Sequence, residues 1–252
     1  MTARADAEKL FAVAADCWGF IESDTVDGWE MRAGAGFTNR ANSVWPLGAV
    51  DRPLTQALDV IRAWYAERGL PAQVQTTIGD RLDAELAGLG CRPHDAALRQ
   101  TAAVGPAIEA LVARAHPNVP VSTAERPQDR WLRLYRAGTV PPEAKAILGS
   151  GGRYCYATIY DEHSGEPLSI GRAVLAGESD SWVGLAGIET APEARRRGLA
   201  RLVLRTLLQW AAQRGAEHAM LEVTSQNDAA AALYRELGFT TAHEYHYRTL
   251  PS

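Results

Sequence analysis

The segment over 191–200 has the composition of an anion-binding turn. It reads Ala-Pro-Glu-Ala-Arg-Arg-Arg-Gly-Leu-Ala and leads from an apolar stretch over 182–190 into a helical pattern over 198–214. The first N–H groups of a helix have no internal partners and lie at the positive end of the helix dipole. Gly198 and the small Ala200 would let a ligand approach this backbone closely. The segment can therefore hold a phosphate or pyrophosphate, although a solvated basic turn would have the same composition.

A second group of residues follows further along the chain. Asn227 precedes a short helical pattern that contains Tyr234 and ends in a Leu-Gly-Phe sequence over 237–239. Asparagine is well suited to cap the N-terminus of a helix. Tyr234 lies beside Leu233 and Leu237 at helical spacing, so a place in the core is its default interpretation.

Together these segments resemble the GNAT acyltransferases. Arg195-x-x-Gly198-x-Ala200 matches the (Arg/Gln)-x-x-Gly-x-(Gly/Ala) signature of that family. Asn227 and the run over 232–239 resemble the family's closing motif. The six-residue signature alone would be weak, but the preceding strand and the later segment make the match specific. The resemblance covers roughly the second half of the chain, from residue 118 onwards.

The resemblance implies that the C-terminal half binds acetyl-CoA. The pyrophosphate would lie on the backbone N–H groups over 196–200, and the arginines would supply charge. The pantetheine arm would pair with the edge over 188–190, where this strand separates from its neighbour over 218–224. Asn227 would contact the cofactor in addition to capping its helix. The residues that the resemblance assigns to acetyl-CoA binding are Ile188, Glu189, Thr190, Arg195, Arg196, Arg197, Gly198, Leu199, Ala200 and Asn227.

The resemblance also implies direct transfer of the acetyl group to an amine. Tyr234 would donate a proton to the leaving CoA thiolate, and strand N–H groups over 188–190 would stabilise the developing oxyanion. A base must remove the ammonium proton, and Glu189 is the carboxylate on this strand nearest the expected carbonyl. An outward-facing strand position is the other interpretation of Glu189. The acceptor stays open among small antibiotic-like amines, polyamines, amino acids and protein amines.

Composition narrows the class of protein. The chain has 252 residues, of which 46% are hydrophobic and 22% charged, close to the globular average. The net charge of −4 argues against a nucleic-acid-binding protein. No apolar run reaches the ~18 residues that span a bilayer, and the N-terminal stretch has an amphipathic pattern unlike a signal peptide. We therefore expect a cytoplasmic protein without a nucleic-acid partner or a membrane contact.

The cysteines and histidines do not suggest a metal site. Cys17, Cys91 and Cys155 lie far apart, and no Cys-x-x-Cys sequence occurs. His243 and His246 are three positions apart, which places them on opposite faces of a strand. We expect acetyl-CoA as a cosubstrate and no metal.

The elements that must position these residues form two similar series. A helix end and strand over 63–77 parallel a helix end and strand over 210–224, at an offset of about 147 residues. We therefore predict an α/β (α+β) fold of tandem GNAT-like domains, each a mixed, mostly antiparallel sheet flanked by helices. Prolines near residue 116 indicate the boundary. It divides the chain into a degenerate GNAT-like domain over 1–116 and an acetyl-CoA-binding catalytic domain over 117–252.

The N-terminal series departs from the GNAT pattern at the positions that would bind the cofactor. Its helix follows Pro53, which has no N–H, and its counterpart of Tyr234 falls near Leu86, which has no hydroxyl. We expect this half either to shape the acceptor cleft or to stabilise the other half. The polar segment over 36–43 could recognise substrate across the interface or simply form a hydrogen-bonded loop.

Two other classes of protein stay open. A catalytically silent CoA-binding protein with a regulatory role would keep the anion-binding turn and lack the base. A structural or partner-binding protein would bind no CoA at all. The oligomeric state and the use of acyl groups other than acetyl are also open.

Overall fold

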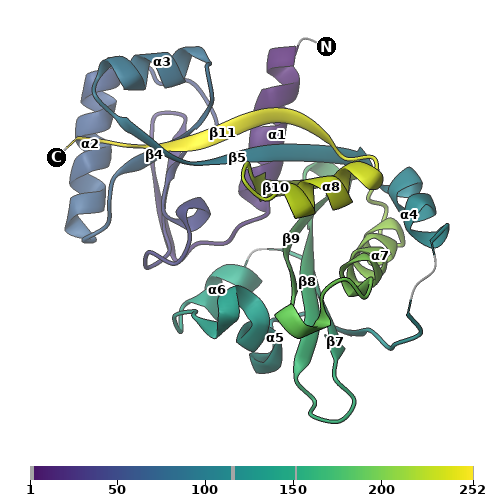
Figure 1. The fold of residues 1–252 in the computed structure, drawn as a ribbon. Helices are drawn as coiled ribbons and strands as arrows, with labels where there is room; N and C mark the ends of the chain where they lie inside the picture. The colour runs from purple at the N-terminus through teal and green to yellow at the C-terminus, as the bar shows by residue number, and fades with distance from the viewer. Residues whose placement is uncertain (1–2, 115–116, 151, 252) are drawn as a thin grey trace.

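The structure of the protein, a computed structural model, describes residues 3–114, 117–150 and 152–251 (Figure 1). The strands are β1 (Glu22–Val26), β2 (Trp29–Ala33), β3 (Val44–Pro46), β4 (Gln73–Thr77), β5 (Arg92–Ala103), β6 (Ser122–Ala124), β7 (Tyr154–Tyr160), β8 (Pro167–Ala176), β9 (Trp182–Thr190), β10 (His218–Thr224) and β11 (Thr240–Thr249). The helices are α1 (Ala3–Asp16), α2 (Leu54–Glu67), α3 (Arg81–Gly88), α4 (Val104–Val112), α5 (Asp129–Leu134), α6 (Ala144–Gly149), α7 (Leu199–Ala212) and α8 (Asp228–Glu236). The single turns of 3-10 helix are η1 (Asn39–Ala41), η2 (Tyr135–Gly138), η3 (Glu178–Asp180) and η4 (Pro192–Ala194).

All these strands join one sheet in the order β1-β2-β3-β4-β11-β5-β10-β9-β8-β7-β6. Among the described strands, β3 pairs parallel with β4 and β9 pairs parallel with β10, and every other neighbouring pair is antiparallel. The predicted α/β fold with a mixed, mostly antiparallel sheet is confirmed. The order is symmetric about the β11–β5 pair, because the parallel pair β3–β4 on one side corresponds to β9–β10 on the other.

The two halves of the chain exchange a strand. β11 lies between β4 and β5, and β5 lies between β11 and β10, so each half contains the last strand of the other. Figure 1 shows β5 and β11 running side by side from one half to the other. Helix α4 directly follows β5 in the chain and also packs against the C-terminal half. Its residues Val104, Ala107 and Leu111 lie in the same core as α7. The boundary predicted between 116 and 117 falls at residues 115–116, outside the described residues, and stays a prediction.

A buried ionic cluster connects β11 to α3 in the N-terminal half. The carboxylate of Asp83 on α3 contacts the ring nitrogen of His246 and the guanidinium of Arg248, both on β11. It also accepts a hydrogen bond of 2.9 Å from the N–H of Gly79. Burial alone would raise the pKa of Asp83, but the hydrogen bonds from Arg248, Gly79 and His246 outweigh it and lower this pKa below its ordinary value.

The elements predicted over 182–190, 198–214 and 218–224 are β9, α7 and β10, and the differences elsewhere have local causes. β1 was not expected, because four of its five residues are exposed and polar, which hides the strand pattern. The segment over 41–47 forms a strand only over Val44–Pro46, because 39–41 turn as η1. The segment over 239–250 forms the single strand β11.

Candidate active site

The parallel strands β9 and β10 separate halfway along their length. Their register runs from His218 opposite Trp182 to Leu221 opposite Leu185 and goes no further, although β9 continues to Thr190. We call the unpaired ends, 186–190 of β9 and 222–224 of β10, the strand fork. The backbone groups that face into the fork have no partner strand, so they are available to an extended ligand.

A β-bulge in β9 shapes one side of the strand fork. Ala186 lies opposite Arg172 of β8 and Glu189 lies opposite Ile170, so two residues of β9 oppose Gly171 alone. Gly187 in the bulge has φ +61°, and a Cβ there would lie 3.1 Å from the ring of Tyr135. Both its backbone angle and its close packing therefore require glycine.

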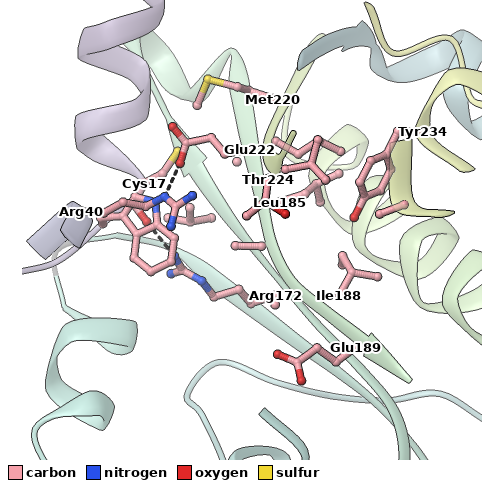
Figure 2. A pocket seen from close by; sticks show the side chains of 18 of the residues that line it. Cys17, Arg40, Arg172, Leu185, Ile188, Glu189, Met220, Glu222, Thr224 and Tyr234 are labelled. Atoms are coloured by element: carbon pink, nitrogen blue, oxygen red, sulfur yellow. Dashed lines mark hydrogen bonds and ion pairs between the residues drawn. The ribbon is translucent and has the colours of Figure 1, made fainter. Parts of the chain in front are cut away.

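A cavity of about 380 Å³ passes through the strand fork. Figure 2 shows Tyr234 on one side of it and Arg40 with Glu222 on the other. The lining comes from β9, β10 and α8, from β8, from the α5–η2 segment and from the N-terminal half. The residues that the sequence predicted for the site and that line this cavity are Ile188, Glu189, Asn227 and Tyr234. The N-terminal half adds Cys17, Trp18 and Arg40.

The N-terminus of α7 opens on a second cavity, of about 510 Å³. Gly198 is the N-cap residue with φ +78°, and Arg196 before it has φ +62°. The first hydrogen bond of this helix end runs from the N–H of Leu202 to the carbonyl of Gly198, at 3.3 Å. The N–H groups over 199–201 therefore have no partner within the helix and face the cavity end. We call this helix start the candidate anion site, because free N–H groups at a helix N-terminus are suited to an anion.

The predicted residues around this turn are not all brought together. The second cavity is lined by Thr190, Arg195, Arg196, Gly198, Leu199 and Ala200, with residues of α8 opposite. Arg197 is exposed and lines neither of these two cavities. The Nε of Arg195 donates to the carbonyl of Thr190 at 3.3 Å, which joins the turn to the end of β9. The candidate anion site and the strand fork are thus consecutive along the chain.

Tyr234 is buried in α8, as its helical spacing predicted, and it also reaches the cavity. Its side chain is 7% exposed, and its ring lies 5.8 Å from that of Phe239. Among the described residues, none forms a hydrogen bond with its hydroxyl, and Figure 2 shows this hydroxyl directed toward the strand fork. Burial raises the pKa of Tyr234 to about 12. The phenol is therefore protonated at neutral pH and free to donate.

Glu189 lies half-buried at the end of β9. Burial raises the pKa of its carboxyl above the ordinary value, and the nearby N–H and charge of Arg136 oppose that rise. Both carboxylate oxygens accept from the backbone N–H of Arg136, at 3.1 Å.

Asn227 caps α8, because its side chain accepts from the N–H of Ala230 at 3.1 Å. The capping interpretation of Asn227 is therefore correct, and Asn227 also lines the cavity.

Two buried charged side chains that line the cavity, Glu222 and Arg172, were not recognised in the sequence. Glu222 of β10 is buried between the guanidinium groups of Arg40 and Arg99, and the bond from Arg99 is 2.7 Å long. Burial alone would raise the pKa of Glu222, but Arg40 and Arg99 lower it to about 2. Arg172 of β8 is 1% exposed and also lines the cavity. A charged residue inside an otherwise apolar strand was the available signal, as in Leu221-Glu222-Val223.

The equivalent positions of the N-terminal half differ as predicted. α2 begins at Leu54 and has Pro53 as its N-cap residue, in the place that Gly198 has before α7. Leu86 of α3 is fully buried where α8 has Tyr234.

Among the described residues, no cluster of three or more metal-ligating side chains occurs. No helix in the described part of the chain is long and apolar enough to cross a membrane.

The open strand fork, the candidate anion site that follows it and the buried tyrosine are the arrangement expected of a GNAT-type acetyltransferase. Residues 4–248 match the family described as "Probable histone acetyltransferase Rv0428c C-terminal". The chain therefore belongs to this family and is an acetyltransferase.

Two curated relatives and one solved structure agree with this assignment. The probable histone acetyltransferase Rv0428c of Mycobacterium tuberculosis is 30% identical over 242 residues, which cover 95% of this chain and 72% of the relative. The uncharacterized N-acetyltransferase YobR of Bacillus subtilis is 28% identical over 253 residues, covering 96% and 98%. A GCN5-related N-acetyltransferase from Kribbella flavida has the same fold, with a TM-score of 0.69 at 16% identity over 100% of this chain and 96% of that one.

Proposed function

We propose that this protein transfers the acetyl group of acetyl-CoA directly to a primary amine. The observation that carries the proposal is the cavity through the strand fork, which joins Tyr234 on the α8 side to Trp18 and Arg40 on the other. A thioester can enter such a cavity from the α7 side while an amine enters from the N-terminal half. The two reactants would then meet without a covalent enzyme intermediate.

The described residues fit acetyl-CoA. The free N–H groups at the start of α7 and the arginines over 195–196 suit the diphosphate. The unpaired edge over 188–190 suits the amide groups of a pantetheine arm, which would add to β9 as an extra strand. Asn227 lies where this arm would enter the cavity. When bound, acetyl-CoA supplies the acetyl group as a thioester.

The side chains around the cavity supply the proton transfers. Glu189, directly or through a water molecule, would accept a proton from the acceptor ammonium, and the raised pKa of its carboxyl suits that role. Backbone N–H groups over 188–190 would stabilise negative charge on the carbonyl oxygen. The amine nitrogen forms the new C–N bond, and the C–S bond then breaks as the hydroxyl of Tyr234 donates its proton to the leaving sulfur. The second proton that the acetylated nitrogen loses would restore this hydroxyl, directly or through a water molecule.

We also propose that the two halves of the chain have different roles. Residues 117–252 would carry the acetyl-CoA site, and residues 1–116 would be a degenerate domain that contributes the acceptor wall. In the N-terminal half, Pro53 and Leu86 stand at the positions equivalent to Gly198 and Tyr234. The same half nevertheless contributes Trp18 and Arg40 to the cavity lining. The acceptor is thus bound between the halves.

Tyr234→Phe is expected to lower kcat by about tenfold and to leave the Kd of acetyl-CoA nearly unchanged. The effect is moderate because a thiol of pKa ~8.5 is already a fair leaving group. The measurement is release of free CoA thiol, with the acetylated amine identified by mass spectrometry. Tyr160→Phe, at the far end of β7, is the matched control. An unchanged kcat in Tyr234→Phe would remove this residue from the chemistry.

Glu189→Gln is expected to lower kcat/KM by about tenfold at pH 7, with a smaller loss at higher pH. The loss shrinks because the acceptor amine then arrives already deprotonated and needs no base. A pH profile of kcat/KM for both proteins checks this. Glu193→Gln, an exposed residue just beyond β9, serves as the control. A loss that is equal at every pH would assign Glu189 a structural role through its bond to Arg136.

A CoA-binding protein without transferase activity is the alternative to direct transfer. It would bind acetyl-CoA tightly, release no CoA thiol with any amine, and respond to Gly198 substitutions but not to Tyr234→Phe. Thiol release measured against a broad panel of amines separates these outcomes.

A further inference from the structure

The wall of the cavity that faces the N-terminal half carries two guanidinium groups on one indole ring. The guanidinium of Arg172 lies 4.2 Å from the centre of the Trp18 ring, and that of Arg40 lies 5.0 Å from it. Trp18 and Arg40 come from the N-terminal half and Arg172 comes from β8. All three line the cavity, and we call them the Trp18 wall.

Arg172 is a buried cation with no counter-ion among the described residues. Its side chain donates to the carbonyl of Cys17 at 3.0 Å and to that of Leu148 at 3.4 Å. Its Nε is buried, and no described residue forms a hydrogen bond with it. No carboxylate in the described part of the chain lies within ion-pair distance of it, and the nearest groups are neutral carbonyls and aromatic rings. A buried charge in this state is costly unless a ligand compensates it.

The other charges of the wall do not supply the missing anion. Glu222 is the carboxylate next to Arg40, and it is shared with Arg99 behind it. Glu222 therefore balances Arg40, whereas Arg172 has no carboxylate beside it among the described residues. Glu189 lies at the β9 end, where its oxygens are held by the N–H of Arg136. The Trp18 wall thus keeps an excess of positive charge.

This excess constrains the acceptor, whose amine arrives as a cation. An ammonium group would be repelled by the Trp18 wall, so the amine must lie at the strand fork near Glu189 and Tyr234. The part of the acceptor against the wall must then be neutral or negative. A planar carboxylate matches a guanidinium in both shape and charge, and aromatic and arginine side chains commonly surround such groups. The cavity volume of about 380 Å³ suits a small molecule better than a folded protein.

We propose that the acceptor is a small amine that also carries a carboxylate, with the carboxylate held at the Trp18 wall and the amine at the strand fork. This inference rests on the proposed acetyl transfer and names the class of its substrate. It excludes polyamines and lysine side chains in basic peptides as preferred acceptors, because both would bring only positive charge to the wall.

Matched pairs of acceptors test this proposal on the unaltered protein. Alanine, leucine, phenylalanine and γ-aminobutyrate are each compared with the corresponding carboxamide, and spermidine is added as a purely cationic amine. Binding of each compound is measured by calorimetry without acetyl-CoA, and kcat/KM is measured by thiol release. For at least one pair we expect the acid to bind about tenfold or more tightly than its amide, since charge-assisted hydrogen bonds are lost in the amide. At a given pH a larger fraction of each amide than of each acid carries a deprotonated amine. The amides are therefore intrinsically more reactive, so a higher kcat/KM for the acids could not come from amine reactivity.

Variants of the wall connect the preference to its residues. Arg172→Gln should reduce the acid-to-amide ratio to about one and leave the Kd of acetyl-CoA unchanged. Arg153→Gln, an exposed arginine of the same half that pairs with Asp180, should preserve the ratio. Because Arg172 is buried, its substitution could impair folding, so Arg136→Gln, an exposed residue at the rim of the cavity, is measured as well. We expect Arg136→Gln to reduce the ratio by a smaller factor.

The two readouts separate this inference from the proposed function. Equal or weaker binding of every acid relative to its amide, or a preference for spermidine, would overturn the carboxylate assignment even if acetyl transfer occurs. Selective binding of acids without any thiol release would support the assignment and contradict the proposed transfer.

Discussion

Gly198→Asp is expected to weaken binding of acetyl-CoA by about 100-fold, which corresponds to about 2.7 kcal/mol. Gly198 is the N-cap residue of α7, and its backbone lies beside the free N–H groups that are proposed to hold the diphosphate. A carboxylate at this position would compete for the same donors and repel the phosphates. The measurement is the Kd of acetyl-CoA by calorimetry at fixed ionic strength.

Gly198→Asn is the matched control for this prediction. Asparagine and aspartate have nearly the same shape, and both tolerate the left-handed backbone angle of +78° better than other side chains. A Cβ at this position would meet only the ring of Pro117, at 3.5 Å, so neither substitution crowds the turn. We expect Gly198→Asn to weaken binding by less than about tenfold, since it adds no charge. Equal losses in the two variants would mean that backbone strain, and not repulsion of an anion, causes the effect.

Glu222→Gln is expected to lower the free energy of unfolding by about 3 kcal/mol. The change removes the negative charge that Arg40 and Arg99 share and leaves both guanidinium groups unbalanced in a buried site. It also weakens the connection between the N-terminal half and β10, because Arg40 belongs to η1 and Arg99 to the exchanged strand β5. Urea unfolding measures the loss. Glu217→Gln, an exposed position just before β10, is expected to change stability by less than about 0.5 kcal/mol.

The same carboxylate predicts a dependence of stability on pH. Arg40 and Arg99 hold the pKa of Glu222 at about 2, below the value of 4.5 for an unperturbed glutamate. A lowered pKa in the folded state stabilises the protein fully above pH 4.5, and that contribution is lost as the pH falls toward 2. The Gln variant should lack this part of the acid dependence. A variant as stable as the unaltered protein at pH 7 would show that the ion cluster contributes little.

Sequence patterns predicted much of this fold because they are local. The turn before α7 combines a strand end, three arginines and a glycine, and each feature is visible within ten residues. The two similar series of elements, from α2 to β5 and from α7 to β11, were visible through their shared end signals. Gly198 and Pro53 occupy equivalent N-cap positions, so the difference between the halves could be predicted as well.

The exchange of β5 and β11 could not be predicted, because it depends on long-range pairing. Each of these strands has the same pattern whether it completes its own half or the other. The Trp18 wall was missed because Trp18, Arg40 and Arg172 are far apart in the sequence and come together only through long-range packing. Glu222 could be noticed as a charged residue inside an apolar strand. Its pairing with two arginines from the N-terminal half could not be predicted, because that pairing is long-range.

The central claim is that the acetyl group enters the strand fork from the α7 side and meets the acceptor between the two halves. A crystal structure of the protein with acetyl-CoA tests this most directly. We expect the diphosphate on the N–H groups over 196–200, the pantetheine arm along 188–190, and the thioester sulfur within hydrogen-bonding distance of the Tyr234 hydroxyl. A cofactor bound at α2 and Pro53 in the N-terminal half, or a thioester lying outside the strand fork, would contradict the account.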